Sequence, residues 1–207
     1  ISSGDCLAIP SVAEELKQLT VLIDCGTPRV FEESSYKYVF RTGPHAAMDN
    51  IAGALYLKRK GITPKKMAAI NQNYAWGQDS WRDFDLTLQQ IMPNTKASDK
   101  TQFPKIFAGQ YGSEISAMSL DKADLVHTSF WGGDLEAFIF QGNARGLFKK
   151  KIGVFTVGGT AAYRLGKKLP NGLVLGARGP YGILVRDRDT ALNNWFVSTY
   201  KNLYGTY

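Results

Sequence analysis

Five short stretches that end in small and aromatic residues carry the chemistry that this sequence supports. They read SSGDC, LIDCGT, NQNYAWGQD, TSFWGGD and FTVGGT. Glycines at such turns let backbone N–H groups approach a ligand, and a helix N-terminus behind them favours an anion such as a carboxylate. Tyr74, Trp76 and Trp131 would add apolar walls, each ring with one polar handle. Turns of this kind without a nucleophile are typical of a binding cleft rather than a reaction site.

The usual catalytic motifs are missing from the sequence. It has no G-x-S-x-G elbow, no H-E-x-x-H, no phosphate-binding loop and no dinucleotide fingerprint. We expect hydrogen-bonded structural roles for His45 and His127, with a pocket role open for His127. Asp5, Asp24 and Asp134 each follow a predicted strand, and helix capping and ligand contact are both open for Asp5 and Asp134. The sequence therefore predicts a protein that is not an enzyme and holds no metal or cofactor.

The composition is that of a globular chain with a core. Its 207 residues are 44% hydrophobic and 21% charged, which suits one medium domain or two small lobes. No apolar run approaches the ~20 residues that cross a bilayer, so we expect no direct membrane insertion. The net charge of +7 is scattered over short lysine clusters that follow apolar segments. Because no nucleic-acid-binding motif accompanies them, they indicate solvated helix ends rather than a nucleic-acid partner.

Cys6 and Cys25 are the two cysteines of the chain. Two are too few for a disulfide scaffold, and their spacing is not that of a metal site. Free, buried thiols are the favoured interpretation. A bond between them stays open, since the thiols could meet if the strands that precede them were neighbours.

Strand and helix patterns alternate along the chain. The predicted strands are 20–23, 38–40, 67–70, 124–128, 152–156 and 173–175, and the predicted helices are 9–19, 46–60, 78–92, 114–120, 134–145 and 190–204. Such alternation predicts an α/β fold of doubly wound parallel sheets, with helices on both faces.

Two similar Gly-Pro segments, FRTGPHAAMDN and GARGPYG, read as hinge crossings between two lobes. We expect residues 1–43 to form part of lobe 1, residues 44–175 to form lobe 2, and residues 176–207 to form a crossing and the return to lobe 1. The first residues read as a strand stub, a glycine turn and a helix, and no strand follows the last helix. The expectation is therefore a chain truncated at both ends, with lobe 1 incomplete.

The segments YKYVFRT, AAINQNYAWGQDSWRDF, ADLVHTSFWGGDLEAFIFQGNARGL and PNGLVLGARGPY resemble type I periplasmic solute-binding proteins. These serve ABC importers of branched-chain amino acids (Leu/Ile/Val) and related solutes, and the resemblance covers essentially the whole chain in order. It implies two doubly wound lobes, joined by hinge crossings, that close on a small solute.

The residues and the resemblance together give a candidate site with seven positions on lobe 1 and five on lobe 2. They are Ser3, Gly4, Asp5, Cys6, Cys25, Gly26 and Thr27, and Tyr74, Trp76, Trp131, Gly132 and Gly158. An acidic residue that neutralises the ammonium of an amino acid in typical members falls near Gly158, where this chain reads TVGGT. Asp5 or Asp24 could supply that charge, and an aromatic or aliphatic carboxylate or an amide fits comparably well.

The resemblance implies an extracytoplasmic solute-binding component of an ABC importer, periplasmic or tethered outside the cell. Its expected partners are a small-molecule solute and a membrane permease. A cytoplasmic ligand-sensing regulator built on the same two-lobe fold is the alternative.

Overall fold

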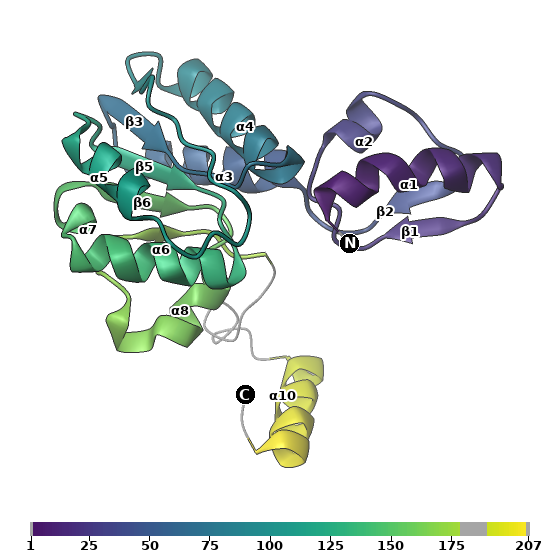
Figure 1. Ribbon diagram of the computed structural model, residues 1–207. Coiled ribbons are helices and arrows are strands. Elements are labelled where there is room, and N and C mark those ends of the chain that lie inside the picture. Colours follow the sequence, from purple (N-terminus) through teal and green to yellow (C-terminus); the bar gives the residue numbers. More distant parts are fainter. Residues whose placement is uncertain (1, 179–189, 206–207) are drawn as a thin grey trace. The chain divides into compact units, whose positions relative to one another are not determined.

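The computed structural model describes residues 2–178 and 190–205 (Figure 1). The chain divides into two compact units, Ile1–Gly176 and Ala177–Tyr207, and each is described by itself. The first unit contains two separate parallel sheets, and the second contains one described helix.

The larger sheet has five parallel strands in the order β4-β3-β5-β6-β7. The strands are β3 (Lys66–Ala69), β4 (Lys96–Ala97), β5 (Leu125–Thr128), β6 (Ile152–Phe155) and β7 (Val174–Leu175). All four residues of β5 are buried, as expected for a strand that has helices on both faces of the sheet. Strand β4 was not predicted from the sequence, and the other four strands lie within a residue or two of their predicted ranges.

Helices cover both faces of this sheet. They are α3 (Ala46–Arg59), α4 (Ala75–Ile91), α5 (Gly112–Leu120), α6 (Gly132–Ala144), α7 (Leu147–Lys150) and α8 (Gly159–Leu165), with a 3₁₀ turn at Gly166–Lys168. One core packs α3 and α4 against Leu125, and the other packs α5 and α6 against Val126. Neighbouring residues of one strand thus enter opposite cores, which is the alternation that a strand imposes. The predicted doubly wound arrangement is confirmed for this sheet.

The smaller sheet pairs β1 (Thr20–Leu22) with β2 (Val39–Arg41), again in parallel. Helices α1 (Ser3–Glu15) and α2 (Arg29–Glu32) accompany it (Figure 1). Its core is small and contains both thiols: Cys6, Ala13, Leu22, Cys25, Val30 and Val39.

The predicted start of α1 is wrong. We expected a strand stub and a glycine turn at Ser3–Cys6, with the helix from Ile9, but these residues form the first turn of α1. The reason is a capping box, in which Asp5 N–H donates to Ser2 Oγ (3.3 Å) and Ser2 N–H donates to Asp5 Oδ2 (2.7 Å). The backbone bond from Ser2 also holds the pKa of the Asp5 carboxyl below its usual range. Pro10, a residue common in first turns, lies inside the helix instead.

The second unit contains α10 (Ala191–Tyr204), and its predicted range of 190–204 is confirmed. The Thr190 side chain caps it by accepting from Asn193 N–H (3.2 Å). The second Gly-Pro pair, Gly179-Pro180, lies outside the described residues, so the division at residues 43 and 175 stays a prediction. Within the described ranges, no helix combines the length and the apolar character that crossing a membrane requires.

Candidate functional site

Three candidate residues lie at the carboxyl ends of adjacent strands. Tyr74 is the N-cap of α4 after β3, Trp131 the N-cap of α6 after β5, and Gly158 the N-cap of α8 after β6. Because β3, β5 and β6 are parallel neighbours, these positions lie along the same edge of the sheet, where the carboxyl ends of the strands meet. In open α/β sheets, ligands bind at this carboxyl edge.

Tyr74 and Trp131 are in direct contact. The indole Nε1–H of Trp131 donates to the hydroxyl of Tyr74 at 2.9 Å. Trp131 is 39% exposed, so part of this residue is accessible to solvent. The next residue, Gly132, has φ +57° and open space where a side chain would begin, and glycine makes this reversal into α6 without strain.

Trp76 has a different environment. It is 4% exposed, and its Nε1–H donates to the carbonyl of Ser129 at 2.9 Å. A Cβ at Gly26 would lie 2.3 Å from the Trp76 ring and 3.2 Å from Ser3 Oγ. The structure therefore brings Ser3, Gly26 and Trp76 together, with the indole as a packed contact rather than an open wall.

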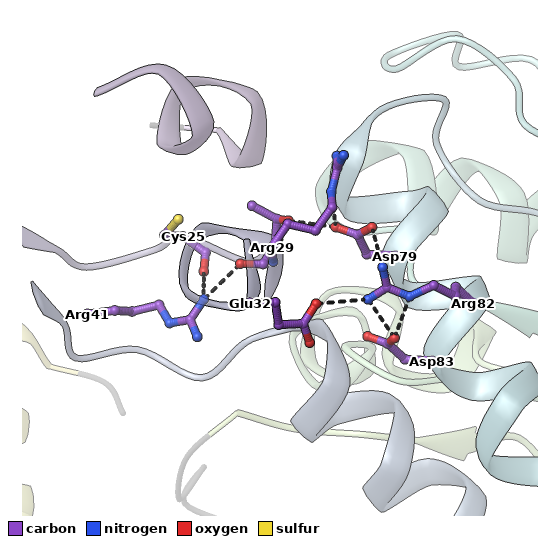
Figure 2. A network of polar contacts seen from close by, with 8 residues as sticks. Cys25, Arg29, Glu32, Arg41, Asp79, Arg82 and Asp83 are labelled. Atoms are coloured by element: carbon purple, nitrogen blue, oxygen red, sulfur yellow. Dashed lines mark hydrogen bonds and ion pairs between the residues drawn. The ribbon is translucent and has the colours of Figure 1, made fainter. Parts of the chain in front are cut away.

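Figure 2 shows Arg29, Asp79 and Arg82 in a polar network at the start of α4, which is also joined by Thr27. Its hydroxyl donates to Asp79 Oδ2 at 2.6 Å, and Arg29 Nε lies 3.4 Å from the same oxygen. The Asp79 side chain is 6% exposed. A buried carboxylate needs such donors, because burial without them would cost several kcal/mol.

Arg82 extends this network on α4. It lies 3.6 Å from Asp79 Oδ1, 3.6 Å from Glu32 and 2.9 Å from Asp83 (Figure 2). Burial raises the pKa of the Asp83 carboxyl, although Arg82 opposes the shift. Each of these carboxylates thus has a guanidinium partner, and the arrangement holds segments together rather than presenting an acid and a base to a substrate.

The other glycines of the candidate site have local roles. Gly158 has no room for a side chain, because a Cβ would lie 2.9 Å from Leu175 and 3.1 Å from Phe155. Gly4 lies in the exposed first turn of α1 beside Ser2. The ligand roles of Gly4 and Gly158 stay predictions.

His127 confirms the structural role expected for it. It is fully buried in β5, with Nε2 2.8 Å from Asn50 Oδ1 and Nδ1 3.4 Å from Asn71 Nδ2. Its ring stacks on Phe84 at 4.2 Å between centroids. Burial lowers the pKa of His127 to about 3, so the imidazole is neutral at physiological pH.

Cys6 and Cys25 are both free and fully buried. Burial raises the pKa of each thiol, and the two side chains interact with one another. We expect neither thiol of the native protein to react with Ellman's reagent at pH 8 within minutes, because the reagent needs an accessible thiolate. In guanidinium chloride both should react. Rapid labelling of the native chain, or fewer than two thiols after denaturation, would contradict this assignment.

Neither Phe107 as a site residue nor the contact made by Asp134 was predicted from the sequence. The Phe107 ring meets Trp131 edge to face, with centroids 5.6 Å apart and planes at 84°. Asp134 is 3% exposed and accepts from Phe107 N–H at 2.8 Å and from Gln72 Nε2 at 2.6 Å. Capping, one of the two roles left open for Asp134, is not what these bonds do. Phe107 lies in a loop without periodic pattern, so no sequence signal marked it.

The family model described as periplasmic binding protein matches residues 1–207. The chain belongs to this family. The two parallel sheets, and the placement of Tyr74 and Trp131 at strand ends, agree with the fold that membership implies.

Similar proteins and solved structures support the same fold. Leu/Ile/Val-binding protein homolog 4 of Brucella abortus is 28% identical over 113 residues, which is 55% of this chain and 27% of that protein. The Leu/Ile/Val/Thr/Ala-binding protein of Brucella ovis, in a closed conformation, has a TM-score of 0.74 at 19% identity, covering 100% of this chain and 53% of its own. A Rhodopseudomonas palustris ABC transporter solute-binding protein in complex with 3,4-dihydroxybenzoic acid has a TM-score of 0.72 at 22% identity, covering 99% and 54%. The chain thus spans about half the length of these solved structures.

Proposed function

We propose that this protein is the extracytoplasmic solute-binding component of an ABC importer, which captures a small solute and delivers it to a membrane permease. The observation that carries the proposal is the partly exposed Trp131, bonded to Tyr74 where adjacent parallel strands end. Family membership supports the same role. Closure of two lobes around the solute would bury it between them.

The proposed binding surface has a polar and an aromatic part. In the Ser3–Cys6 turn, the N–H groups of Ser3 and Gly4 would be the donors, because those of Asp5 and Cys6 already donate to Ser2. The partial positive charge of this first turn of α1 favours a carboxylate. The Cys25–Thr27 segment would add backbone donors beside it. Tyr74 and Trp131, with Gly132 and Gly158 at the neighbouring helix starts, would form the second side, and Trp76 would support them from beneath.

The proposed solute is a small carboxylate or amide. Gly158 offers no negative charge to an ammonium group, so an amino acid gains no ion pair there. Solved relatives include an amino-acid-binding protein and one in complex with an aromatic acid, and both classes are therefore candidates. A flat carboxylate combines the anion that helix N-termini favour with a ring that packs on Trp131.

The first test is differential scanning fluorimetry of the natural full-length protein with leucine, benzoate and urea at millimolar concentration. A true ligand at ~100 times its dissociation constant should add about 2.7 kcal/mol to the free energy of unfolding. Stabilisation by one class and not the others identifies the solute. No stabilisation by amino acids, aromatic acids or amides would overturn the proposal.

Replacing Trp131 by alanine should weaken binding of that solute by about 1–3 kcal/mol, because the variant loses an aromatic contact surface. The thermal midpoint of the ligand-free variant should stay close to that of the parent, since Trp131 is 39% exposed. Calorimetric titration measures the affinity. Trp195→Ala, which removes an exposed tryptophan of α10, is the matched control and should leave the affinity unchanged. A loss of stability with unchanged affinity would assign Trp131 to packing instead.

A further inference from the structure

Phe107 has a backbone conformation that phenylalanine rarely adopts. Its φ is +60°, in the left-handed region where a bulky side chain crowds its own backbone. The other described residue of this kind is Lys17, just after α1, where helix ends commonly turn left-handed. Phe107 lies instead at the third position of a turn that is closed by a bond from Ala108 N–H to the Lys105 carbonyl at 3.2 Å, a position where a positive φ normally calls for glycine or asparagine.

Asp134 holds this conformation. The Phe107 N–H donates to Asp134 Oδ2 at 2.8 Å, and Gln72 Nε2 donates to the same oxygen at 2.6 Å. Asp134 and Gln72 are 3% and 1% exposed, so both bonds lie in a buried environment where they are strong. Gln72 is two residues before Tyr74, and Asp134 is three residues after Trp131. One buried carboxylate therefore ties together the three segments that carry Tyr74, Phe107 and Trp131.

The strained backbone at Phe107 does not bring its side chain into a hydrophobic core. The Phe107 side chain is 68% exposed, so its ring adds little to either core. Backbone strain that persists without a gain in burial is typical of functional sites, where it aims a side chain. Here it aims the ring edge to face at Trp131, with the two planes at 84°. The two rings form the adjoining walls of a corner beside Tyr74.

We propose that Phe107 is a ligand-contacting residue that selects a flat aromatic ring, and that Asp134 is the positioning residue that holds it there. Two apolar ring surfaces at a right angle let a third ring stack on one and meet the other by its edge, the two arrangements that aromatic pairs favour. A branched aliphatic side chain gains less from this corner. The inference rests on the proposed solute-binding function and names the part of the solute that the corner receives.

The test compares benzoate with leucine, by calorimetric titration of the natural full-length protein. Phe107→Gly removes the ring while allowing φ +60° without strain, so its thermal midpoint should equal or exceed that of the parent. Its affinity for benzoate should fall about three- to tenfold, with a smaller change for leucine. Phe140→Ala, which removes an exposed ring of α6, is the control and should change neither affinity.

Asp134 is tested through a double-variant cycle. Asp134→Ala should lower the benzoate-to-leucine affinity ratio in the parent but leave that ratio unchanged in the Phe107→Gly background, because Asp134 acts through Phe107. Asp134→Asn, which keeps an acceptor for the Phe107 N–H, should restore the ratio. An equal effect of Asp134→Ala on the ratio in both backgrounds would overturn the positioning role.

The outcomes separate the inference from the function on which it rests. Benzoate binding that is equally tight in Phe107→Gly and the parent overturns the inference alone, as does an equal loss of affinity for both probes. Binding of leucine without benzoate overturns the preference for a flat ring while leaving a solute receptor. A parent protein that binds no amino acid, aromatic acid or amide overturns the proposed function, and the inference with it.

Discussion

A Gly77→Ala variant should lose about 3 kcal/mol or more of its free energy of unfolding. Gly77 is buried in the first turn of α4, and a Cβ there would lie 2.0 Å from the carbonyl oxygen of Gln72. That carbonyl cannot move aside easily, because it accepts from Tyr74 N–H at 2.9 Å and the Gln72 side chain is bonded to Asp134. A clash between backbone and Cβ must be relieved by a backbone shift, and overpacking of this kind is among the costlier substitutions.

Gly133→Ala is the matched control for this prediction. Gly133 also lies in the first turn of a helix that follows a strand end, but nothing lies within 4 Å of its Cβ position. Alanine there should be neutral or stabilise by up to about 1 kcal/mol, the usual gain over glycine in a helix. Denaturant titrations of the parent and both variants measure the difference. Similar losses for Gly77→Ala and Gly133→Ala would contradict the packing described around α4.

His127 should make the stability of the protein depend steeply on pH below about 6.5. Burial lowers the folded-state pKa to about 3, whereas an unfolded chain has the ordinary value of 6.5. As the pH falls below 6.5, His127 becomes protonated in the unfolded state but stays neutral in the folded state. The contribution of His127 is therefore complete above pH 6.5 and is lost down to about pH 3, at up to about 1.4 kcal/mol per pH unit.

A His127→Gln variant isolates this contribution. The groups that face His127 are Asn50 on α3, Asn71 after β3, and Trp81 and Phe84 on α4; none of them ionises. The variant should be less stable than the parent at pH 7.5, since it loses the stack on Phe84. The gap should then narrow as the pH falls from 6.5 to 4.5, because glutamine does not titrate. Denaturant titrations at each pH measure the gap, and a gap that is constant with pH would rule out a neutral buried imidazole.

The sequence was sufficient for the sheet and insufficient for the contacts around it. Strand β5 was predictable because Leu125–Thr128 is a continuous run of residues that all become buried. Strand β4 was not, since Lys96 and Ala97 are exposed and form a strand through their pairing with β3. The start of α1 was readable in principle from Ser2 and Asp5, but Pro10 read more naturally as a first-turn residue.

Contacts between distant segments account for most of what the sequence left out of the candidate site. The bond from Thr27 to Asp79 joins residues 52 apart, and the bond from Phe107 to Asp134 joins residues 27 apart. Residue types and spacing predict which edge of a parallel sheet is functional, because the carboxyl ends of all its strands lie at that edge. They do not predict which buried carboxylate will reach which backbone N–H, since that depends on the assembled fold.

The two sheets differ in how readily they would accept another strand. The outermost strands of the larger sheet, β4 and β7, have two residues each and so offer few free backbone groups to a neighbour. In the smaller sheet both strands are outermost, and their paired residues Val21 and Phe40 are about half exposed. An exposed apolar strand of this kind is a common starting point for aggregation. Self-association of the purified 207-residue chain should therefore begin at β1 and β2. A Val21→Lys substitution should reduce it, because a charge on an edge strand opposes pairing with another chain.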